Sequence, residues 1–345
     1  MRVPPARYGG TERIVAELTA ELVRRGHDVT LFAAATSFTA ARLWSVAPRP
    51  LWELTAYESF PYEIAQVETV ARNAASFDII HWHLDFLHWL VVDQLPTPSV
   101  TTMHGRLDTD SVRLMFAAHP EHPVISISDS QMRPVSDLAL NWVATIHHGL
   151  DLAGSFRLGG GDGGYLAFVG RSSADKGLAT AIRIAIRTGT PIKIGARVGP
   201  PPQVYHESEV EPLLDHPLVE WLGEISDAEK AVLLEGAKAL IMPIEWEEPF
   251  GLSFIESLAA GTPIITRARG ALPEIMRDGL HGYFVDTEDD MVQAIAKLDD
   301  IDRAECRRWA LDRFSTQRMV DDYEYAYRRV LDAGTISAPA RVSAA

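Results

Sequence analysis

Cysteine is almost absent from this 345-residue sequence, whose one thiol is Cys306. A single cysteine excludes an internal disulfide and fits a reducing compartment. Long apolar runs are also missing, since no stretch approaches the ~20 residues that a bilayer-spanning helix needs. The start, MRVPPARYGG, lacks the apolar region of a signal peptide. We therefore expect a cytoplasmic protein without a transmembrane segment, and peripheral contact with a membrane stays open.

Positive charge is scarce: 32 Lys and Arg stand against 47 Asp and Glu, which gives a net charge of −15. Such an acidic balance argues against broad nucleic-acid binding, although it allows a local basic pocket. The length is too great for one ordinary core and favours two domains.

The stretch from Trp246 to Ile264, WEEPFGLSFIESLAAGTPI, predicts a loop, a helix and a strand. An apolar run, Ala239–Ile244, precedes it and is typical of a buried strand. Gly261 suits the end of the helix, and Pro263 prevents its continuation. In open α/β sheets, ligands bind at the loops that follow the carboxyl ends of the strands.

Two glutamates occupy this loop and helix. Glu248 stands at the helix entrance, and Glu256 follows after seven intervening residues. The two oxygens of Glu256 could hold a vicinal diol, and Glu248 could reach another part of the same ligand. Alternatively, Glu256 is a solvated helix residue and Glu248 only favours the helix N-terminus. The spacing alone does not decide between these interpretations.

A second strand, loop and helix lie in YLAFVGRSSADKGLATAIRIAIRTG. Arg171 and Lys176 flank its loop, where a guanidinium and an ammonium near a helix N-terminus could clamp a diphosphate. The alternative is a solvated lysine and an arginine at a strand end. Gly9 and Gly10 precede the first helix and allow a ligand to approach the backbone, or else form a tight turn.

Four residues resemble a metal cluster: His81, His83, Asp85 and His88. His81 and His83 would share one face of a strand, but strand ends in α/β folds often carry polar residues, so we expect no metal site.

The glycines at 159, 161 and 164 match the G-x-G-x-x-G fingerprint of dinucleotide-binding proteins. That fingerprint needs a strand before the glycines and a helix after them. Here the strand YLAFVG follows instead, so we reject an NAD site.

The segment EEPFGLSFIESLAAGTPI resembles the E-x7-E signature of the retaining glycosyltransferases of family 4, which have the GT-B fold. The surrounding residues match that pattern as well: Pro249, Phe250, Gly251, Gly261, Thr262 and Pro263. The resemblance implies that Glu248 contacts the donor sugar and that Glu256 binds the ribose of the nucleotide.

GRSSADKG resembles the GR-x4-KG segment of the same family, which implies that Arg171 and Lys176 bind the donor diphosphate. The backbone at Gly10 and Gly251 would approach the phosphates. His104, in a TxHG-like segment, would contact the donor sugar, and Ile225 would lie near the nucleobase.

The resemblance extends over about residues 4–333 and implies two doubly wound, Rossmann-like domains that face a central cleft. We expect an N-terminal acceptor-side domain over 1–157 and a nucleotide-sugar-binding domain over 158–316. We expect a closing helix at 317–333 and a disordered tail at 334–345. The implied reaction is transfer of a hexose, with retention, from a UDP- or GDP-linked sugar to an unidentified acceptor, with no metal and no cofactor.

Several alternatives remain open. The chain could be a catalytically silent nucleotide-sugar-binding or scaffold protein of the same fold, or an epimerase acting on a nucleotide sugar. Asp108 and Asp110 form the D-x-D of metal-dependent glycosyltransferases with another fold. We expect Asp110 to cap a helix instead.

In the family, a strand of about six residues precedes the segment that begins at Pro4, and it is central in the sheet. Here Met1, Arg2 and Val3 are followed by two prolines, which cannot serve a central strand. We therefore expect the strands DVTLFAAA and FDIIHWH to be separated by a gap or to have unpaired edges. A shortened N-terminus is the hypothesis that follows.

Overall fold

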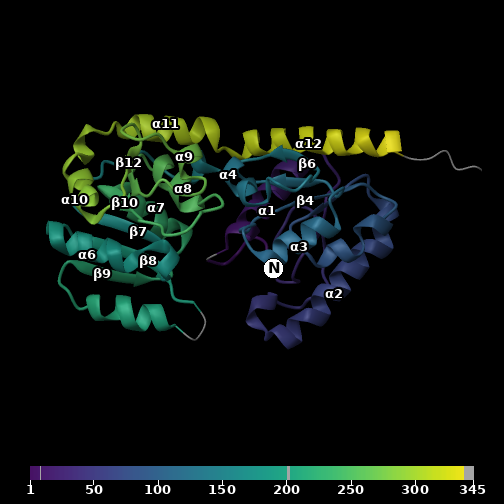
Figure 1. Cartoon of the computed structure of the whole chain (residues 1–345), viewed down its shortest axis with the longest axis horizontal. Coiled ribbons are helices and arrows are strands. Elements are labelled where there is room, and N and C mark those ends of the chain that lie inside the picture. The colour runs from purple at the N-terminus through teal and green to yellow at the C-terminus, as the bar shows by residue number, and fades with distance from the viewer. Residues whose placement is uncertain (8, 200–202, 338–345) are drawn as a thin grey trace, which may run out of the picture. The chain divides into compact units, whose positions relative to one another are not determined.

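The computed structural model describes residues 1–7, 9–199 and 203–337, and the chain forms two compact units. Unit 1 comprises Met1–Pro5, Thr11–His147 and Gln317–Ala345, and unit 2 comprises Ala6–Gly10 and His148–Thr316. Each unit has its own parallel sheets (Figure 1). The tail expected to be disordered, 334–345, lies outside the described residues from 338 onward.

Unit 2 contains a six-stranded sheet in the order β12-β11-β10-β7-β8-β9, and every strand pair in it is parallel. Its strands are β7 (Leu166–Arg171), β8 (Ile192–Arg197), β9 (Val219–Gly223), β10 (Ala239–Ile241), β11 (Ile264–Thr266) and β12 (Gly282–Phe284). The chain order along the sheet reverses between β7 and β10, as in doubly wound folds. The Rossmann-like architecture expected for this half is confirmed.

Helices surround this sheet and bury its central strands. They are α5 (Leu152–Ser155), α6 (Leu178–Thr188), α7 (Asp227–Gly236), α8 (Leu252–Ala259), α9 (Leu272–Ile275), α10 (Glu288–Ala296) and α11 (Arg303–Arg313). Every residue of β10 and β11 is buried. Continuous apolar runs of this kind are typical of strands in parallel sheets that are covered on both faces.

Unit 1 contains two separate sheets. The larger has the order β3-β4-β5-β6, and the smaller pairs β1 with β2. The strands are β1 (Thr30–Phe32), β2 (Arg42–Trp44), β3 (Ile80–Trp82), β4 (Ser99–Thr102), β5 (Val124–Ser126) and β6 (Trp142–Thr145). All of these pairs are parallel.

The helices of unit 1 include the helix at the C-terminal end of the chain. They are α1 (Gly10–Arg24, whose first residue belongs to unit 2), α2 (Ala56–Asn73), α3 (Asp110–Ala118), α4 (Asp129–Met132) and α12 (Thr316–Ser337). In α12, Tyr327 lies 2.8 Å from His81 Nδ1, and Asp321 accepts a hydrogen bond from Arg25 at 2.6 Å. The range 317–333, where a closing helix was expected, lies within α12, and Gln317 is the first residue of this helix that belongs to unit 1.

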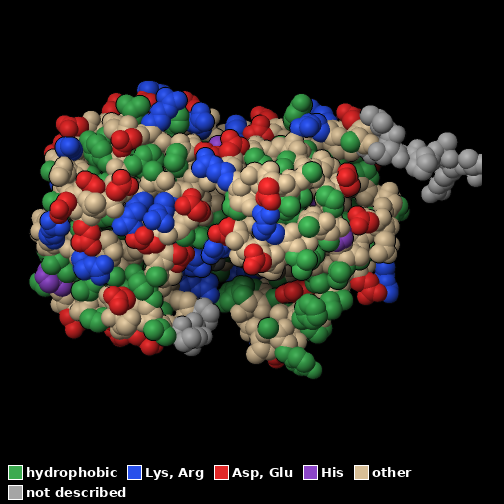
Figure 2. Space-filling view, in the orientation of Figure 1, with side chains coloured by type: hydrophobic (Ala, Val, Ile, Leu, Met, Phe, Trp, Pro, Cys, Tyr) green, Lys and Arg blue, Asp and Glu red, His purple; other side chains and the backbone are tan. Residues whose placement is uncertain are grey.

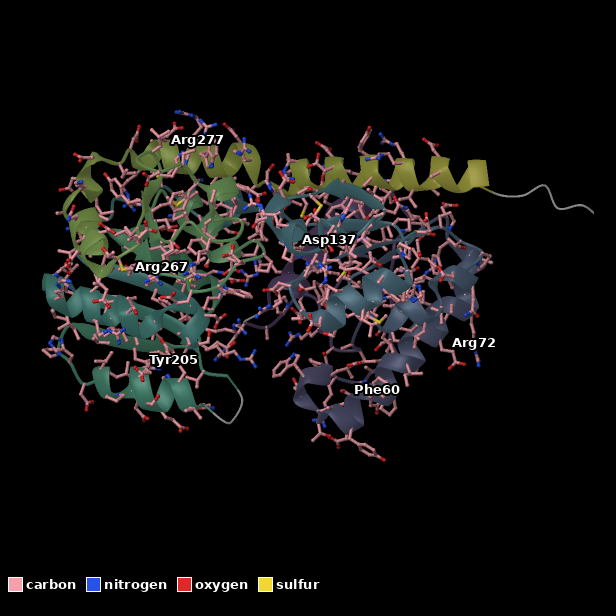
Figure 3. The ribbon with its side chains drawn as sticks, in the orientation of Figure 1. Phe60, Arg72, Asp137, Tyr205, Arg267 and Arg277 are labelled. Atoms are coloured by element: carbon pink, nitrogen blue, oxygen red, sulfur yellow. The ribbon has the colours of Figure 1, made fainter. Side chains whose placement is uncertain are left out.

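Charged side chains of both signs are interspersed over the face of unit 2 that Figure 2 shows. In unit 1, apolar side chains at the start of α2 are exposed to solvent: Tyr57 is 91% exposed, and Phe60, which Figure 3 labels, is 52% exposed. Over the described ranges, no helix is both long and apolar enough to cross a membrane.

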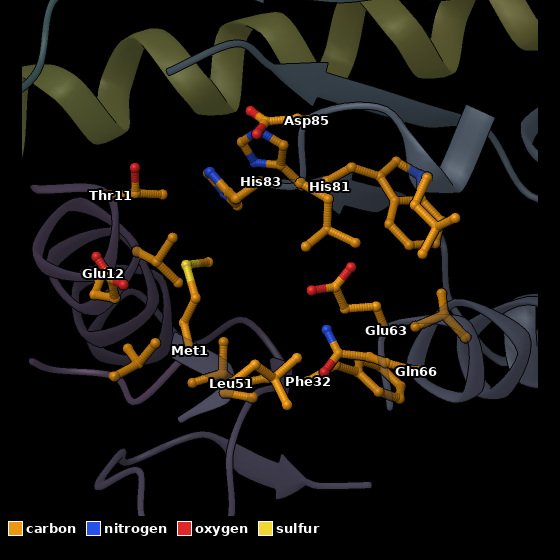
Figure 4. A pocket seen from close by; sticks show the side chains of 18 of the residues that line it. Met1, Thr11, Glu12, Phe32, Leu51, Glu63, Gln66, His81, His83 and Asp85 are labelled. Atoms are coloured by element: carbon orange, nitrogen blue, oxygen red, sulfur yellow. The ribbon is translucent and has the colours of Figure 1, made fainter. Parts of the chain in front are cut away.

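A cavity of about 800 Å³ lies between β1 and β3 (Figure 4). The consecutive residues 30–33 line one side, and the consecutive residues 79–87 line another. Because alternate side chains of a strand point to opposite faces, a run of consecutive lining residues means that the strand edges themselves border the cavity. The two strands also belong to different hydrophobic clusters, one around Leu31 and one around Ile80. The expected gap between the two strands is therefore confirmed.

Met1 is one of the residues that line this cavity (Figure 4), and its carbonyl oxygen accepts a hydrogen bond from the Ala34 amide at 2.8 Å. Burial lowers the pKa of the Met1 amino group. A strand fused ahead of Met1 could lie between β1 and β3, parallel to both, and form hydrogen bonds with the unpaired edge of each.

We expect that fusing a six-residue strand rich in Val and Ile ahead of Met1 will raise the thermal midpoint by at least ~5 °C, because it adds ladder hydrogen bonds and fills a cavity. Differential scanning calorimetry measures this change. The control is a fusion of equal length made of Gly, Ser and Pro, which cannot form a central strand. Equal midpoints for the two fusions would contradict this account of the cavity.

Candidate functional site

The two predicted loops of unit 2 follow neighbouring strands. Arg171 is the last residue of β7, and Glu248 lies in the loop after β10. Because β7 and β10 are paired in parallel, their carboxyl ends meet at one edge of the sheet. This is the point at which the strand order reverses, where doubly wound folds bind their ligands.

Lys176 and Glu248, from these two loops, form an ion pair with each other. Both side chains are nearly buried, with exposed fractions of 11% and 8%. Trp246 completes the group: its Nε1 donates to Glu248 Oε2 at 3.1 Å, and its ring lies 4.9 Å from Lys176 Nζ. Two residues that the resemblance assigned to different parts of the donor are thus in direct contact.

Not every N–H group of Arg171 has a hydrogen-bond partner among the described residues. Its Nη2 donates to Asp175 Oδ2 at 3.0 Å. Its Nε and the hydroxyl of Ser173 are buried without a hydrogen-bond partner among the described residues. Buried donors are normally satisfied, so these two groups mark a place where an anion would gain hydrogen bonds.

The loop that carries Glu248 is fixed by its backbone. Gly270 has φ +59°, and a Cβ there would come within 2.2 Å of the Glu248 carbonyl oxygen. Ala271 N donates to that same carbonyl at 2.8 Å, and Gly270 N donates to Glu247 Oε2 at 2.7 Å. Only glycine permits this close approach, so the position of Glu248 depends on a residue 22 positions later in the chain.

Gly251 forms the N-cap of α8 with φ +96°. A Cβ at this position would lie 2.6 Å from the Phe254 ring, so glycine is required. Gly10 lies beside the next residue, since a Cβ built on it would be 3.6 Å from Leu252 Cδ1. The structure therefore places Gly10 and Gly251 together at the N-terminus of α8.

Glu256 lies on α8 and is almost fully buried, at 3% exposure. Its Oε1 accepts a hydrogen bond from Lys230 Nζ of α7 at 2.5 Å. The sequence reasoning missed Lys230. One signal was present in the sequence. Leu233 and Leu234 follow Lys230 by three and four residues and so share its face of the helix, which is buried. A lysine on a buried face needs a partner.

Ile225 lies in the loop between β9 and α7 and packs over β8. A Cβ added to Gly195 in β8 would come within 2.4 Å of Ile225 Cδ1. This contact places Ile225 on unit 2 beside the carboxyl half of β8. Its role near a nucleobase stays a prediction.

His104 belongs to unit 1 and follows β4. Its Nε2 lies 2.9 Å from His83 Nδ1, and burial lowers the pKa of His104 to about 4. The imidazole is therefore uncharged at neutral pH. Its role as a donor-sugar contact stays a prediction.

The histidines that resembled a metal cluster have other partners. His81 Nε2 lies 2.7 Å from Thr102 Oγ1, and His88 Nε2 lies 2.7 Å from Thr101 Oγ1. Because Thr101 and Thr102 are consecutive in β4, the two histidines contact opposite faces of the sheet. Within the described residues, no three His, Cys, Asp or Glu side chains gather as a metal site would require.

The aspartates of the D-x-D pattern also have local structural roles, one in an ion pair and the other in the first turn of a helix. Asp108 accepts two hydrogen bonds from Arg106, at 2.5 and 2.7 Å. The predicted cap at Asp110 was wrong by one residue: Thr109 is the N-cap of α3, and its side chain accepts from Val112 N. Asp110 is the first helical residue, where its charge favours the helix N-terminus.

Cys306 is buried in α11, and burial raises its pKa to about 12. A thiol in this state is a poor nucleophile. The expectation that Cys306 packs in a helix is confirmed.

We expect Lys176→Met to lower the free energy of unfolding by about 3 kcal/mol, because it leaves Glu248 buried without its cation. Urea denaturation measures the change. Lys193→Met is the matched control, since Lys193 pairs with Glu220 at 3.0 Å where both side chains are substantially exposed. If both variants lose the same free energy of unfolding, the buried Lys176–Glu248 pair contributes no more to stability than the exposed Lys193–Glu220 pair.

Two family models match the chain: "Glycosyl transferases group 1" over residues 160–310 and "Glycosyltransferase Family 4" over residues 8–153. D-inositol 3-phosphate glycosyltransferase from Mycolicibacterium vanbaalenii is 26% identical, and the match covers 94% of this chain and 86% of that protein.

Among solved structures, the chain is similar to AviGT4, a glycosyltransferase involved in avilamycin A biosynthesis. The identity is 24% and the TM-score 0.70, with 96% of this chain and 93% of that one covered. It is also similar to the Anabaena protein HepE in complex with UDP-glucose, at 15% identity and a TM-score of 0.73, with 95% and 97% covered. Taken together with the parallel α/β architecture of both units, these matches show that the chain belongs to the family 4 glycosyltransferases with the GT-B fold.

Proposed function

We propose that this glycosyltransferase moves a hexose from a UDP- or GDP-linked sugar to an acceptor, with retention of the anomeric configuration. The observation that carries the proposal is the buried Lys176–Glu248 pair, formed by the loops that follow the paired strands β7 and β10 at the edge where β7 ends in Arg171. HepE, a structural neighbour, binds UDP-glucose, which supports a nucleotide sugar as the donor.

The demanding step is the departure of the nucleoside diphosphate. The bond between the anomeric carbon and the diphosphate oxygen breaks, and its electron pair leaves with that oxygen. Arg171, whose Nε has no hydrogen-bond partner in the described part of the chain, and Lys176 would stabilise the charge that develops. The first amides of α8, beside Gly10 and Gly251, would add fixed donors.

The donor diphosphate would compete with Glu248 for Lys176. The ammonium has three N–H donors, so it can turn toward a phosphate while it keeps one contact with the carboxylate. The second oxygen of Glu248 would then be available to orient the hydroxyl groups of the donor sugar. Glu256 would hold the ribose, Ile225 would pack near the base, and His104 would contact the sugar.

The acceptor stays open. The mycobacterial relatives are named for D-inositol 3-phosphate, but about a quarter identity does not transfer that specificity to this chain. Family membership favours a transferase over a silent binding protein. Transfer without a metal ion, and a cytoplasmic location, remain parts of the proposal that activity in EDTA and cell fractionation test.

Calorimetric titration with UDP and GDP tests the donor site. We expect one of these nucleotides to bind, and we expect Arg171→Ala to weaken that binding by about 1.5–3 kcal/mol, the range for hydrogen bonds to charged groups. Arg183→Ala is the control, because Arg183 lies exposed on α6 at 3.9 Å from Glu288. Equal affinity in the Arg171 variant and the wild type would remove this residue from the site.

Substitutions of the two glutamates should affect different constants, one the nucleotide affinity and the other the turnover rate. We expect Glu256→Ala to weaken nucleotide binding, and Glu248→Gln to preserve nucleotide affinity while it lowers kcat by about 100-fold, because a ground-state contact and a transition-state contact affect different constants. Titration with UDP, together with UDP release from UDP-glucose in the presence of an acceptor, separates the two effects. The assignment fails if both variants lose affinity and rate in the same proportion.

A further inference from the structure

We propose that Lys230 is a positioning residue that holds Glu256 in the orientation that recognises ribose. The inference rests on the proposed function, because it assumes that Glu256 faces the ribose of the donor. Neither the resemblance nor the relatives assign a role to Lys230.

The contact between the two residues is almost completely removed from water. The exposed fractions of the Lys230 and Glu256 side chains are 10% and 4%, and Nζ donates to Oε1 at 2.5 Å. In such surroundings a carboxylate that loses its cation pays a large desolvation cost. The ammonium therefore compensates the charge of the carboxylate and fixes its orientation.

A second carboxylate also lies near Lys230, but in a different environment. Asp227 Oδ1 is 3.2 Å from Nζ, and its side chain is 68% exposed. Solvent screens an exposed ion pair, so this contact contributes little. The buried contact with Glu256 is the one that determines where the ammonium lies.

The helix that carries Lys230 is fixed at its start. Ser226 and Glu229 form a capping box at the N-terminus of α7: Ser226 N donates to Glu229 Oε2 at 2.7 Å, and Glu229 N donates to Ser226 Oγ at 3.3 Å. Lys230 is the next residue after this box. The backbone position of Lys230 is therefore fixed before any ligand binds, and the Lys230 ammonium holds the carboxylate of Glu256.

This arrangement connects two predicted contacts of the nucleoside. Ile225, predicted to lie near the base, directly precedes the cap of α7, and Glu256, predicted to bind the ribose, is tied to the same helix through Lys230. A carboxylate held in one orientation can accept hydrogen bonds from the ribose hydroxyl groups at little entropic cost. A carboxylate that is free to turn would discriminate less between ribose and deoxyribose.

The experiment compares the affinities of UDP and 2′-deoxy-UDP by calorimetry, or of the guanine pair if the wild type prefers GDP. We expect the wild type to bind the ribonucleotide at least about tenfold more tightly, which is the loss expected for one hydrogen bond to a charged group. In Lys230→Met we expect the ratio to fall below about threefold. Lys230→Gln serves if the Met variant does not fold. Lys193→Met is the matched control and should keep the wild-type ratio.

A purely structural role gives a different result. If Lys230 only stabilises unit 2, the variants will melt at lower temperature but keep the wild-type ratio, and the inference is then wrong. In a Glu256→Ala background, Lys230→Met should produce no further change in UDP affinity, whereas an independent further loss would contradict an action through Glu256. Absence of UDP and GDP binding in the wild type would instead refute the proposed function.

Discussion

The pairing of β7 with β10 decides where unit 2 can gather charged groups. Leu166 and Ala167 of β7 pair with Ala239 and Leu240 of β10, although the strands are far apart in the sequence. Since the chain order reverses at this pair, the loops that follow the two strands diverge to opposite sides of the sheet and leave space between their starting points. Arg171 and Glu248 belong to those loops, so a backbone pairing of buried aliphatic residues determines the location of the polar site.

The site is organised by two lysine–glutamate pairs that are shielded from water. Lys176 pairs with Glu248, and Lys230 pairs with Glu256. Each pair supplies a cation to a carboxylate in a place where burial of that carboxylate alone would be costly. The pairs differ in their surroundings. The first lies in the loops that follow β7 and β10, and the Nε of Arg171 at the end of β7 has no hydrogen-bond partner among the described residues. The second lies between the helices α7 and α8. This difference favours exchange of partners in the first pair and fixed orientation in the second.

The parts of the structure that local patterns control were predictable from the sequence. The predicted strands YLAFVG and Ala239–Ile244 contain β7 and β10, although β10 ends earlier, at Ile241. Gly261 and Pro263 follow the end of α8 as their conformational preferences require. The functional assignments of Glu248 and Glu256 came from a resemblance. Lys230 was not predicted, because its partner is 26 residues away and only tertiary packing brings them together. The cap at Thr109 was missed because Thr and Asp both suit that position.

The gap between β1 and β3 has a consequence for the dynamics of unit 1. The cluster of Val3, Val15, Leu31 and Ala33 is distinct from the cluster around Val67 and Ile80, and Phe32 is the side chain of β1 that packs against the latter. Segments with separate cores open with separate free energies. The segment containing β1 and β2 can therefore unfold locally while β3 to β6 stay folded, and its amide protons would exchange with solvent first. Unit 1 would thus contain one segment, β1 and β2, whose amide protons are less protected from exchange than those of β3 to β6.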